Sequence, residues 1–259
     1  NLSQPGPGNK GIRHMRTLAV YQLKGGVGKT TTVVNLAALA AREGIPVLVW
    51  DMDPQAAASW ILGAEAKRKQ DGFWNEHKPL SDYIQHTAIP KLDVLSADAS
   101  LRKFHQRVDS KKDAKQRVSQ ALSALGESYG LVIIDCPPMM TPQMEGVLKA
   151  CDRILLPVEP SLLSIRAYQQ IKEDFDWAKP KQWLPFVTMI DRRKAGHVAW
   201  VKKELKAYPE FMKTYIAYSA SAERMLTLRK PIVEEQPAVP LARNYMALWK
   251  ALKPSLNLK

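Results

Sequence analysis

Residues 17–31 read TLAVYQLKGGVGKTT, an apolar run followed at once by a glycine-rich stretch and two threonines. The apolar run, residues 17–22, predicts a buried β-strand. The segment Thr30 to Arg42 predicts a helix, because its apolar residues recur close to a 3.6-residue period and Gly44 is a typical helix stop. The order of strand, glycine-rich turn and helix indicates the start of an α/β fold.

The glycine-rich turn has the composition of a phosphate-binding loop. Its glycines can adopt backbone angles that let successive N–H groups converge on phosphate oxygens, and the positive end of the following helix adds attraction. Lys29 is placed to reach the β and γ phosphates of a nucleotide, and Thr30 can offer a hydroxyl to Mg²⁺. A strict P-loop has a glycine where Leu23 stands, so the strict pattern fails at that position.

The rest of the chain continues the alternation of strands and helices. Strand-like apolar runs occur at 46–50, 92–96, 131–134, 153–158, 184–190 and 214–217. Near-continuous apolar strands separated by helices predict one α/β domain with a mainly parallel, twisted sheet and helices on both faces. Residues 64–90 are polar and irregular and predict a surface excursion, whereas 98–126 predicts a basic helical segment.

Length and composition set the limits of this domain. The chain has 259 residues and 46% hydrophobic residues, enough for one sizeable core. Residues 1–14 are rich in Pro, Gly and Asn and resemble a tag or disordered leader, which leaves 15–259 as the domain. Cys136 and Cys151 are too few for a disulfide framework and are expected to be buried. With no long apolar run and no signal peptide, we expect a cytoplasmic protein.

Aspartates follow two of the predicted strands. Asp51 and Asp53 stand in the sequence DMDPQ after the second strand, and Asp135 ends the apolar run LVIID. In an open parallel sheet, ligands bind beyond the carboxyl ends of the strands. Taken alone, an aspartate there is more often a helix cap or a turn residue. Because both motifs occur in order with the glycine-rich turn, we favour a nucleotide site.

The sequence KGGVGKTT, residues 24–31, resembles the deviant P-loop of the ParA/MinD family of ATPases. The DMDPQ and LVIID elements match two further family motifs, and a looser likeness extends over roughly 16–253. The resemblance implies ATP and Mg²⁺ as cofactors and an ATP-dependent homodimer, in which Lys24 reaches the partner's nucleotide. Electrostatics is consistent with this role of Lys24, since a cation that arrives on dimerisation would stabilise the charge on the transferred phosphoryl group, as an arginine finger does.

The same resemblance assigns roles to individual residues. It implies that Asp53 positions the attacking water, that Asp51 supports the metal site and that Asp135 holds Mg²⁺ through a water. The expected catalytic residues are thus Lys24, Lys29 and Asp53, and the metal residues are Thr30, Asp51 and Asp135. The nucleotide-binding residues are Lys24, Gly25, Gly26, Val27, Gly28, Lys29, Thr30 and Thr31. The family's adenine contacts lie near 188–194 and 229–237, where the match is too loose to transfer single residues.

The basic charge is concentrated toward the C-terminus. Of the formal net charge of +13, residues 179–259 carry +10, which favours a polyanionic partner over a merely solvated surface. In ParA proteins this region binds double-stranded DNA without sequence preference. The candidate DNA contacts are Arg192, Arg193, Lys202, Lys203, Arg224 and Lys230. A second basic stretch near 102–117 reads as a helix exterior, and no helix-turn-helix precedes the P-loop.

Two other readings remain open. A MinD-like ATPase at a membrane surface needs a terminal amphipathic helix, and 241–253 offers one, although we expect it to pack onto the sheet. The second open reading is a metabolic relative that phosphorylates or reduces a small molecule. The five histidines are scattered and show no spacing typical of metal ligands. The resemblance also implies a small ParB-like or adaptor partner that stimulates a weak hydrolysis. It leaves the cargo open among a plasmid, a chromosome region, a chemotaxis array and a protein microcompartment on the nucleoid.

Overall fold

An eight-stranded sheet forms the centre of the protein, in the strand order β3-β4-β2-β5-β1-β6-β7-β8. The computed structural model describes residues 15–67, 69–70, 73–74, 78–103, 111–175 and 182–258. The strands are β1 Arg16–Val20, β2 Val47–Asp51, β3 Ile84–His86, β4 Leu92–Leu95, β5 Leu131–Asp135, β6 Arg153–Val158, β7 Trp183–Ile190 and β8 Tyr215–Ala217. All neighbours pair in parallel except β3, which runs antiparallel to β4 at one edge. The predicted mainly parallel sheet is confirmed.

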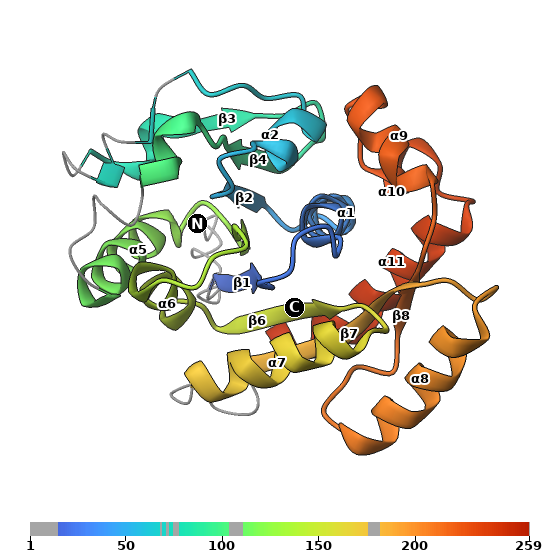
Figure 1. Ribbon diagram of the computed structural model, residues 1–259. Coiled ribbons are helices and arrows are strands. Elements are labelled where there is room, and N and C mark those ends of the chain that lie inside the picture. The colour runs from blue at the N-terminus through green and yellow to red at the C-terminus, as the bar shows by residue number, and fades with distance from the viewer. Residues whose placement is uncertain are drawn as a thin grey trace, which may run out of the picture.

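Helices cover both faces of this sheet (Figure 1). They are α1 Lys29–Arg42, α2 Ala57–Ile61, α5 Lys111–Leu125, α6 Pro142–Lys149, α7 Leu162–Asp174, α8 Ala195–Ala207, α9 Ser221–Leu228, α10 Ile232–Glu235 and α11 Pro240–Leu252, with 3₁₀ turns at Leu80–Tyr83, Ala99–Lys103 and Lys253–Leu256. One core cluster joins the sheet to α5, α6 and α7, and a second joins it to α1, α2, α9, α10 and α11. The sheet thus separates two cores.

The strand that carries the glycine-rich turn is the most protected part of the sheet. β1 lies between β5 and β6, and its residues Leu18, Ala19 and Val20 are fully buried. It ends at Val20 rather than at the predicted residue 22, although the Tyr21 N–H still donates to the Leu155 carbonyl of β6 at 3.0 Å. A buried central strand gives the turn a rigid base.

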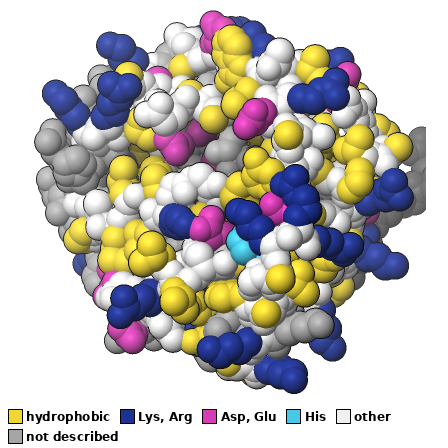
Figure 2. All heavy atoms as spheres, turned by 45° about the vertical axis from the view of Figure 1, so that its right-hand side comes forward, with side chains coloured by type: hydrophobic (Ala, Val, Ile, Leu, Met, Phe, Trp, Pro, Cys, Tyr) yellow, Lys and Arg dark blue, Asp and Glu magenta, His cyan; other side chains and the backbone are white. Residues whose placement is uncertain are grey.

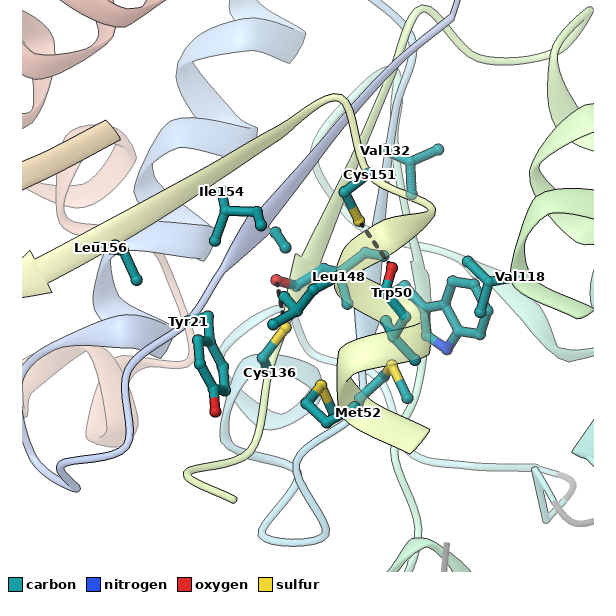
Figure 3. Packing of buried hydrophobic residues seen from close by; sticks show 14 of the residues in the cluster. Tyr21, Trp50, Met52, Val118, Val132, Cys136, Leu148, Cys151, Ile154 and Leu156 are labelled. Carbon is teal, nitrogen blue, oxygen red and sulfur yellow. Dashed lines mark hydrogen bonds between the residues drawn. The ribbon is translucent and has the colours of Figure 1, made fainter. Parts of the chain in front are cut away.

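Both cysteines lie inside the core, as expected. Figure 3 shows Cys136, just after β5, and Cys151, just before β6, among Tyr21, Trp50 and Leu148. Both thiols are free and buried, and burial is the main cause that raises their pKa values above the usual range. They are packing residues, since a neutral buried thiol is a poor nucleophile.

The expected surface excursion at 64–90 is wrong in part. Phe73, Trp74, Leu80 and Tyr83 are buried and pack against Trp50 of β2 and the helices on that face. Gln70 is also fully buried, and its side-chain amide donates to the carbonyls of Asp51 and Ser96, each at 3.0 Å. The apolar residues of this segment follow no helical or strand period, so the sequence pattern gave them no weight.

The last helix packs onto the sheet, as predicted. Leu241, Tyr245, Leu248, Trp249 and Leu252 of α11 are buried in the core that α11 shares with α1. Trp249 Nε1 also donates to Glu43 at the end of α1, over 2.9 Å. The apolar face that a membrane-surface helix would need is therefore occupied. Among the helices of the described residues, none is long and apolar enough to cross a bilayer.

A buried amide fixes α1 to the C-terminal part of the chain. Asn35 is fully buried; its Nδ2 donates to the Thr31 carbonyl at 2.7 Å, and its Oδ1 accepts from the Val233 backbone N–H at 3.1 Å. Asn35 therefore holds α1 in place although it is not part of the apolar pattern that predicted the helix. The helix itself starts at Lys29, one residue before the predicted start.

We predict that Asn35→Ala lowers the free energy of unfolding by about 1–3 kcal/mol, because the Val233 N–H would stay buried without an acceptor. Urea denaturation followed by circular dichroism measures the change. Gln116→Ala, at an exposed amide on α5, is the control and is expected to stay within about 0.5 kcal/mol of wild type. Equal stabilities of the two variants would contradict the role given to Asn35.

Candidate nucleotide and metal site

The turn between β1 and α1 forms an open cradle of backbone N–H groups. Gly26 and Gly28 have φ angles of 73° and 85°, which are strained for any residue with a side chain. A Cβ added at Gly25 or Gly26 would meet no heavy atom within 4 Å, so space for a ligand exists beside them. Gly28 caps α1 with no side-chain hydrogen bond, which leaves the first N–H groups of the helix for an anion.

A buried glutamine anchors the start of this turn. Gln22 is fully buried; its Nε2 donates to the Pro157 carbonyl of β6 at 3.2 Å, and its Oε1 accepts from the Leu23 N–H at 2.9 Å. The turn is therefore tied to β6 as well as to β1. Sequence reasoning missed Gln22, and a polar residue at the end of an apolar strand was the only signal that pointed to it.

Thr30 and Asp135 meet at the mouth of the cradle. The Thr30 hydroxyl donates to Asp135 Oδ2 at 2.7 Å, although 105 positions separate them in the sequence. Asp135 is only 1% exposed, and its Oδ1 has no hydrogen-bond partner among the described residues. A buried carboxylate oxygen without a donor is costly unless a cation or a water bound to one completes it. The residues present therefore fit Mg²⁺.

The protein offers few ligands for such a cation. Among the residues that the structure describes, no group of three or more His, Cys, Asp or Glu side chains is placed to hold a metal ion. Mg²⁺ retains most of its waters and commonly takes only one or two protein ligands beside phosphate oxygens. Thr30 and Asp135 are thus a sufficient protein contribution at this position.

Asp51 supports the site from behind. It lies beside Asp135 in the β2–β5 pairing and is fully buried. Its Oδ1 accepts from the Asp53 N–H at 3.1 Å, and its Oδ2 accepts from the Ser59 N–H at 2.9 Å and the Ser59 hydroxyl at 2.6 Å. Because protein donors already engage both oxygens, Asp51 holds the loop that carries Asp53 and the start of α2. Ser59 is a second residue that sequence reasoning missed.

Asp53 is the more open of the two carboxylates. It is half-buried, and its Oδ1 accepts from the Gln55 N–H at 3.0 Å, which shapes the turn before α2. Its negative charge acts on both Lys29 and Asp135, so the three groups lie in one electrostatic environment. The structure thus brings Asp53, Lys29 and Asp135 together at the carboxyl edge of the sheet, where the sequence placed them.

Burial shifts the pKa values of the charged side chains at this site. Burial raises the pKa of Asp51 to about 6 and also raises the pKa of Asp135, where the neighbouring charge of Asp51 adds to the effect. Burial lowers the pKa of Lys29, and attraction to Asp135 and Asp53 opposes that shift. A cation beside Asp135 and phosphates beside Lys29 would favour the charged forms again. The site is arranged for charged ligands.

Lys24 does not share this environment. Its backbone carbonyl lies 3.5 Å from Lys29 Nζ, within the cradle, but its side chain forms an ion pair with Glu159 in the loop between β6 and α7. Its ammonium group is therefore held at the surface beside α7. The remaining loop residues, Val27 and Thr31, are buried and half-buried beneath the cradle.

Several candidate DNA contacts already have partners on the protein. Arg193 bonds both oxygens of Asp191 at 2.9 Å and lowers the pKa of that carboxyl to about 2. Lys230 lies 3.6 Å from Glu235. Arg224 lies beside the Gln236 side-chain amide. With the amide oxygen oriented toward the guanidinium, Arg224 Nη1 and Nη2 donate to it at 3.0 and 3.1 Å.

The other candidates differ in their surroundings. The Arg192 guanidinium lies over the Tyr215 ring, with 5.4 Å to the ring centroid, and donates to the Tyr215 hydroxyl, while no carboxylate of the described residues is within ion-pair distance of it. Lys203 is exposed on α8, and the Lys202 side chain lies outside the described residues. Figure 2 shows Lys and Arg side chains in separate groups over the face that the C-terminal elements form, with acidic and apolar side chains between them.

Comparison with known proteins shows a family for this chain. A family model described as an AAA domain matches residues 15–182. The chromosome partitioning protein ParA of Caulobacter vibrioides is 30% identical over 70% of this chain and 72% of its own length. The sporulation initiation inhibitor protein Soj of Bacillus subtilis is 28% identical over 91% of this chain and 97% of its own length. The match to a candidate replication protein A of Sinorhizobium fredii, 32% identical, covers 63% of this chain and only 44% of that protein.

Solved structures share the fold at lower sequence identity. Apo McdA from Cyanothece has a TM-score of 0.79 and 21% identity, over 92% of this chain and 100% of that one. The septum site-determining protein MinD of Pyrococcus horikoshii, solved with Mg-ADP, has a TM-score of 0.75 and 17% identity, over 92% of this chain and 96% of that one. These structures show the shared fold. The family model and the curated relatives show that the chain belongs to the ParA/MinD family of partition ATPases.

Proposed function

We propose that this chain is an ATP-dependent switch that dimerises around bound nucleotide, binds DNA without sequence preference and positions a cargo on the nucleoid. The observation that carries the nucleotide part is the Thr30–Asp135 pair, with its unpartnered carboxylate oxygen, at the mouth of the glycine cradle. ATP and Mg²⁺ are its cofactors: the MinD structure from Pyrococcus horikoshii was solved with Mg-ADP, and the site residues fit the same kind of ligand.

Hydrolysis rests on placement rather than on a strong base. Mg²⁺ would neutralise charge on the phosphate oxygens, and Thr30 and Asp135 would hold it. Lys29 is buried beside the cradle and would neutralise charge on the phosphates. Asp53, fixed by its backbone bond to Asp51, is set to orient the attacking water. In a loose phosphoryl-transfer transition state, orienting the water matters more than removing its proton, so a weak, partner-stimulated rate fits this site.

The dimer would bury the edge where Lys24 lies. Leu162 and Leu163, at the start of α7, are 71% and 69% exposed, and Met140, in the loop after β5, is 38% exposed. Tyr21 of the glycine-rich turn bonds the carbonyl of Met139, so the loop with Met140 also borders the cradle. Exposed leucines next to a charged ligand site are what a second copy of the chain would cover.

DNA binding rests on charge and on the family. The +10 excess of residues 179–259 and the lack of any recognisable sequence-reading motif favour phosphate contacts. A dimer doubles the number of such weak contacts, so ATP occupancy can switch the affinity steeply. The partners are thus a second copy, double-stranded DNA and a small ParB-like or adaptor protein that stimulates hydrolysis, in a cytoplasmic, nucleoid-associated setting. The packed α11 disfavours the membrane-surface reading.

We predict that ATP with Mg²⁺ converts the protein from monomer to dimer and that ADP does not, because only ATP carries the γ-phosphate that a partner's Lys24 can contact. Light scattering or analytical ultracentrifugation gives the mass in each state. Lys24→Ala is expected to stay monomeric with either nucleotide. Equal masses of the wild type with ATP and with ADP would refute the sandwich dimer.

We predict that Asp53→Ala binds ATP and dimerises but hydrolyses on the order of a hundredfold more slowly, because it loses the positioning of water while the cradle remains. Lys29→Ala is expected to lose nucleotide binding itself. Titration with a fluorescent ATP analogue and a phosphate-release assay separate these two effects. Wild-type hydrolysis by Asp53→Ala would show that another group orients the water.

We predict that the ATP-bound dimer binds unrelated duplexes with similar affinity. Neutralising about six phosphates gives a log–log salt slope near −5 in a mobility-shift titration. Arg192→Ala should weaken binding more than Arg193→Ala, because Asp191 already neutralises Arg193. The same loop thus supplies the variant and its matched control.

The other candidates, Lys202, Lys203, Arg224 and Lys230, are tested singly in the same way. A true phosphate contact lowers affinity evenly across sequences and makes the salt slope shallower. Sedimentation with anionic liposomes runs beside the DNA titration. Liposome binding without DNA binding would replace the nucleoid proposal with the membrane-surface one.

A further inference from the structure

The ion pair between Lys24 and Glu159 joins the phosphate loop to the loop after β6. The two residues are 135 positions apart, and their side chains are 36% and 23% exposed. The Ser161 hydroxyl, 3.2 Å from the same Glu159 oxygen, donates to it as well. The ammonium of Lys24 is thus neutralised within its own subunit.

The backbone prepares this pair. Gln22, two residues before Lys24, donates to the carbonyl of Pro157, two residues before Glu159, and accepts from the Leu23 N–H. The two loops are therefore clamped at their bases by a fully buried side chain. Because the clamp sets the separation of the loops, the pair forms without further ordering of the backbone, and only the entropy of the two side chains opposes it.

The pair also stands at the border of the proposed dimer face. Leu162 and Leu163 follow Glu159 within four positions and are the most exposed of the large apolar side chains in the described residues. A partner that covers them approaches Glu159 and Lys24 together. One ammonium group cannot keep its full contact with a carboxylate while it binds the phosphates of another subunit.

We propose that Glu159 is a latch on Lys24, which holds the lysine in its own subunit until the partner's ATP displaces it. The latch rests on the proposed function, in which Lys24 acts across the dimer. It opposes dimerisation in every nucleotide state, and only a nucleotide with enough negative charge at the γ position outcompetes the carboxylate. By lowering the tendency to dimerise in both states, the latch keeps the ADP-bound protein monomeric at concentrations at which the ATP-bound protein dimerises, since only ATP supplies the interaction that favours the dimer.

The size of the effect follows from the exposure of the pair. A partly exposed ion pair of this kind changes an equilibrium by roughly twofold, and each dimer releases two of them. Removing the carboxylate should therefore tighten the dimer by about fourfold. Salt screens such a pair, so the gain should shrink as the ionic strength rises.

The test is the dimer dissociation constant of Glu159→Gln, measured by sedimentation velocity with Mg²⁺ and a non-hydrolysable ATP analogue. We expect a constant about fourfold below that of wild type in low salt, a smaller difference in high salt and an unchanged affinity for ADP. Glu223→Gln, the same change at an exposed carboxylate on α9, is the matched control and should leave the constant unchanged. If Glu159→Gln melts below wild type, Glu159→Asp takes its place, and its shorter side chain should shift the constant in the same direction.

A double variant shows whether Glu159 acts through Lys24. Glu159→Gln added to Lys24→Ala should produce no gain in dimerisation, because the latch has nothing left to hold. A gain there would overturn the proposal, since the carboxylate would then simply repel the partner. An equal or weaker dimer of the folded Glu159→Gln protein would also overturn it. A wild type that stays monomeric with the ATP analogue would overturn the proposed function as well.

Discussion

The parallel pairing of β1 with β5 is the constraint on which the site depends. Its register sets Val20 opposite Asp135, so the strand that ends in the glycine cradle and the strand that ends in the carboxylate finish side by side. The turn after β1 then carries Thr30 back to within 2.7 Å of Asp135. A slip of this register by one residue would send Asp135 to the other face of the sheet and leave Thr30 without its partner. The many buried apolar residues of both strands make such a slip costly.

Several charged side chains are buried at this same edge of the sheet, and their burial does not stabilise the fold. Asp51 and Asp135 lie on neighbouring strands with almost no exposure, and Lys29 lies nearby, 7% exposed. Removing these carboxylates from water costs free energy, repulsion between neighbouring carboxylates adds to it, and the raised pKa values of Asp51 and Asp135 are the sign of that cost. Ser59 and the Asp53 N–H offset part of it at Asp51, whereas Asp135 Oδ1 is left without a donor. The cost is best explained as preparation for a cation and phosphates, which complete the site electrostatically.

Around this rigid centre, the parts expected to change between states lie at the surface. The cradle is tied down by Gln22 and by the helix that Asn35 fixes to the C-terminal segment. The Lys24 side chain, by contrast, is held by a partly exposed ion pair, near exposed leucines. Such a division suits a switch, because the binding geometry stays fixed while the contacts that report on occupancy remain free to exchange.

The sequence by itself determined the phosphate loop, the order of strands and helices, and the three motifs that end their strands, because these depend on short-range backbone geometry and on apolar periodicity. It could not show that Phe73, Trp74 and Gln70 enter the core, since they follow no period and their burial depends on what β2 and α5 leave uncovered. Nor could it place Ser59 behind Asp51, because that contact depends on how the loop after β2 folds back. It also could not place Glu159 against Lys24, which is 135 positions away. Such a distant contact forms only when the strand order brings the two loops to one edge of the sheet, and that order is decided by tertiary packing.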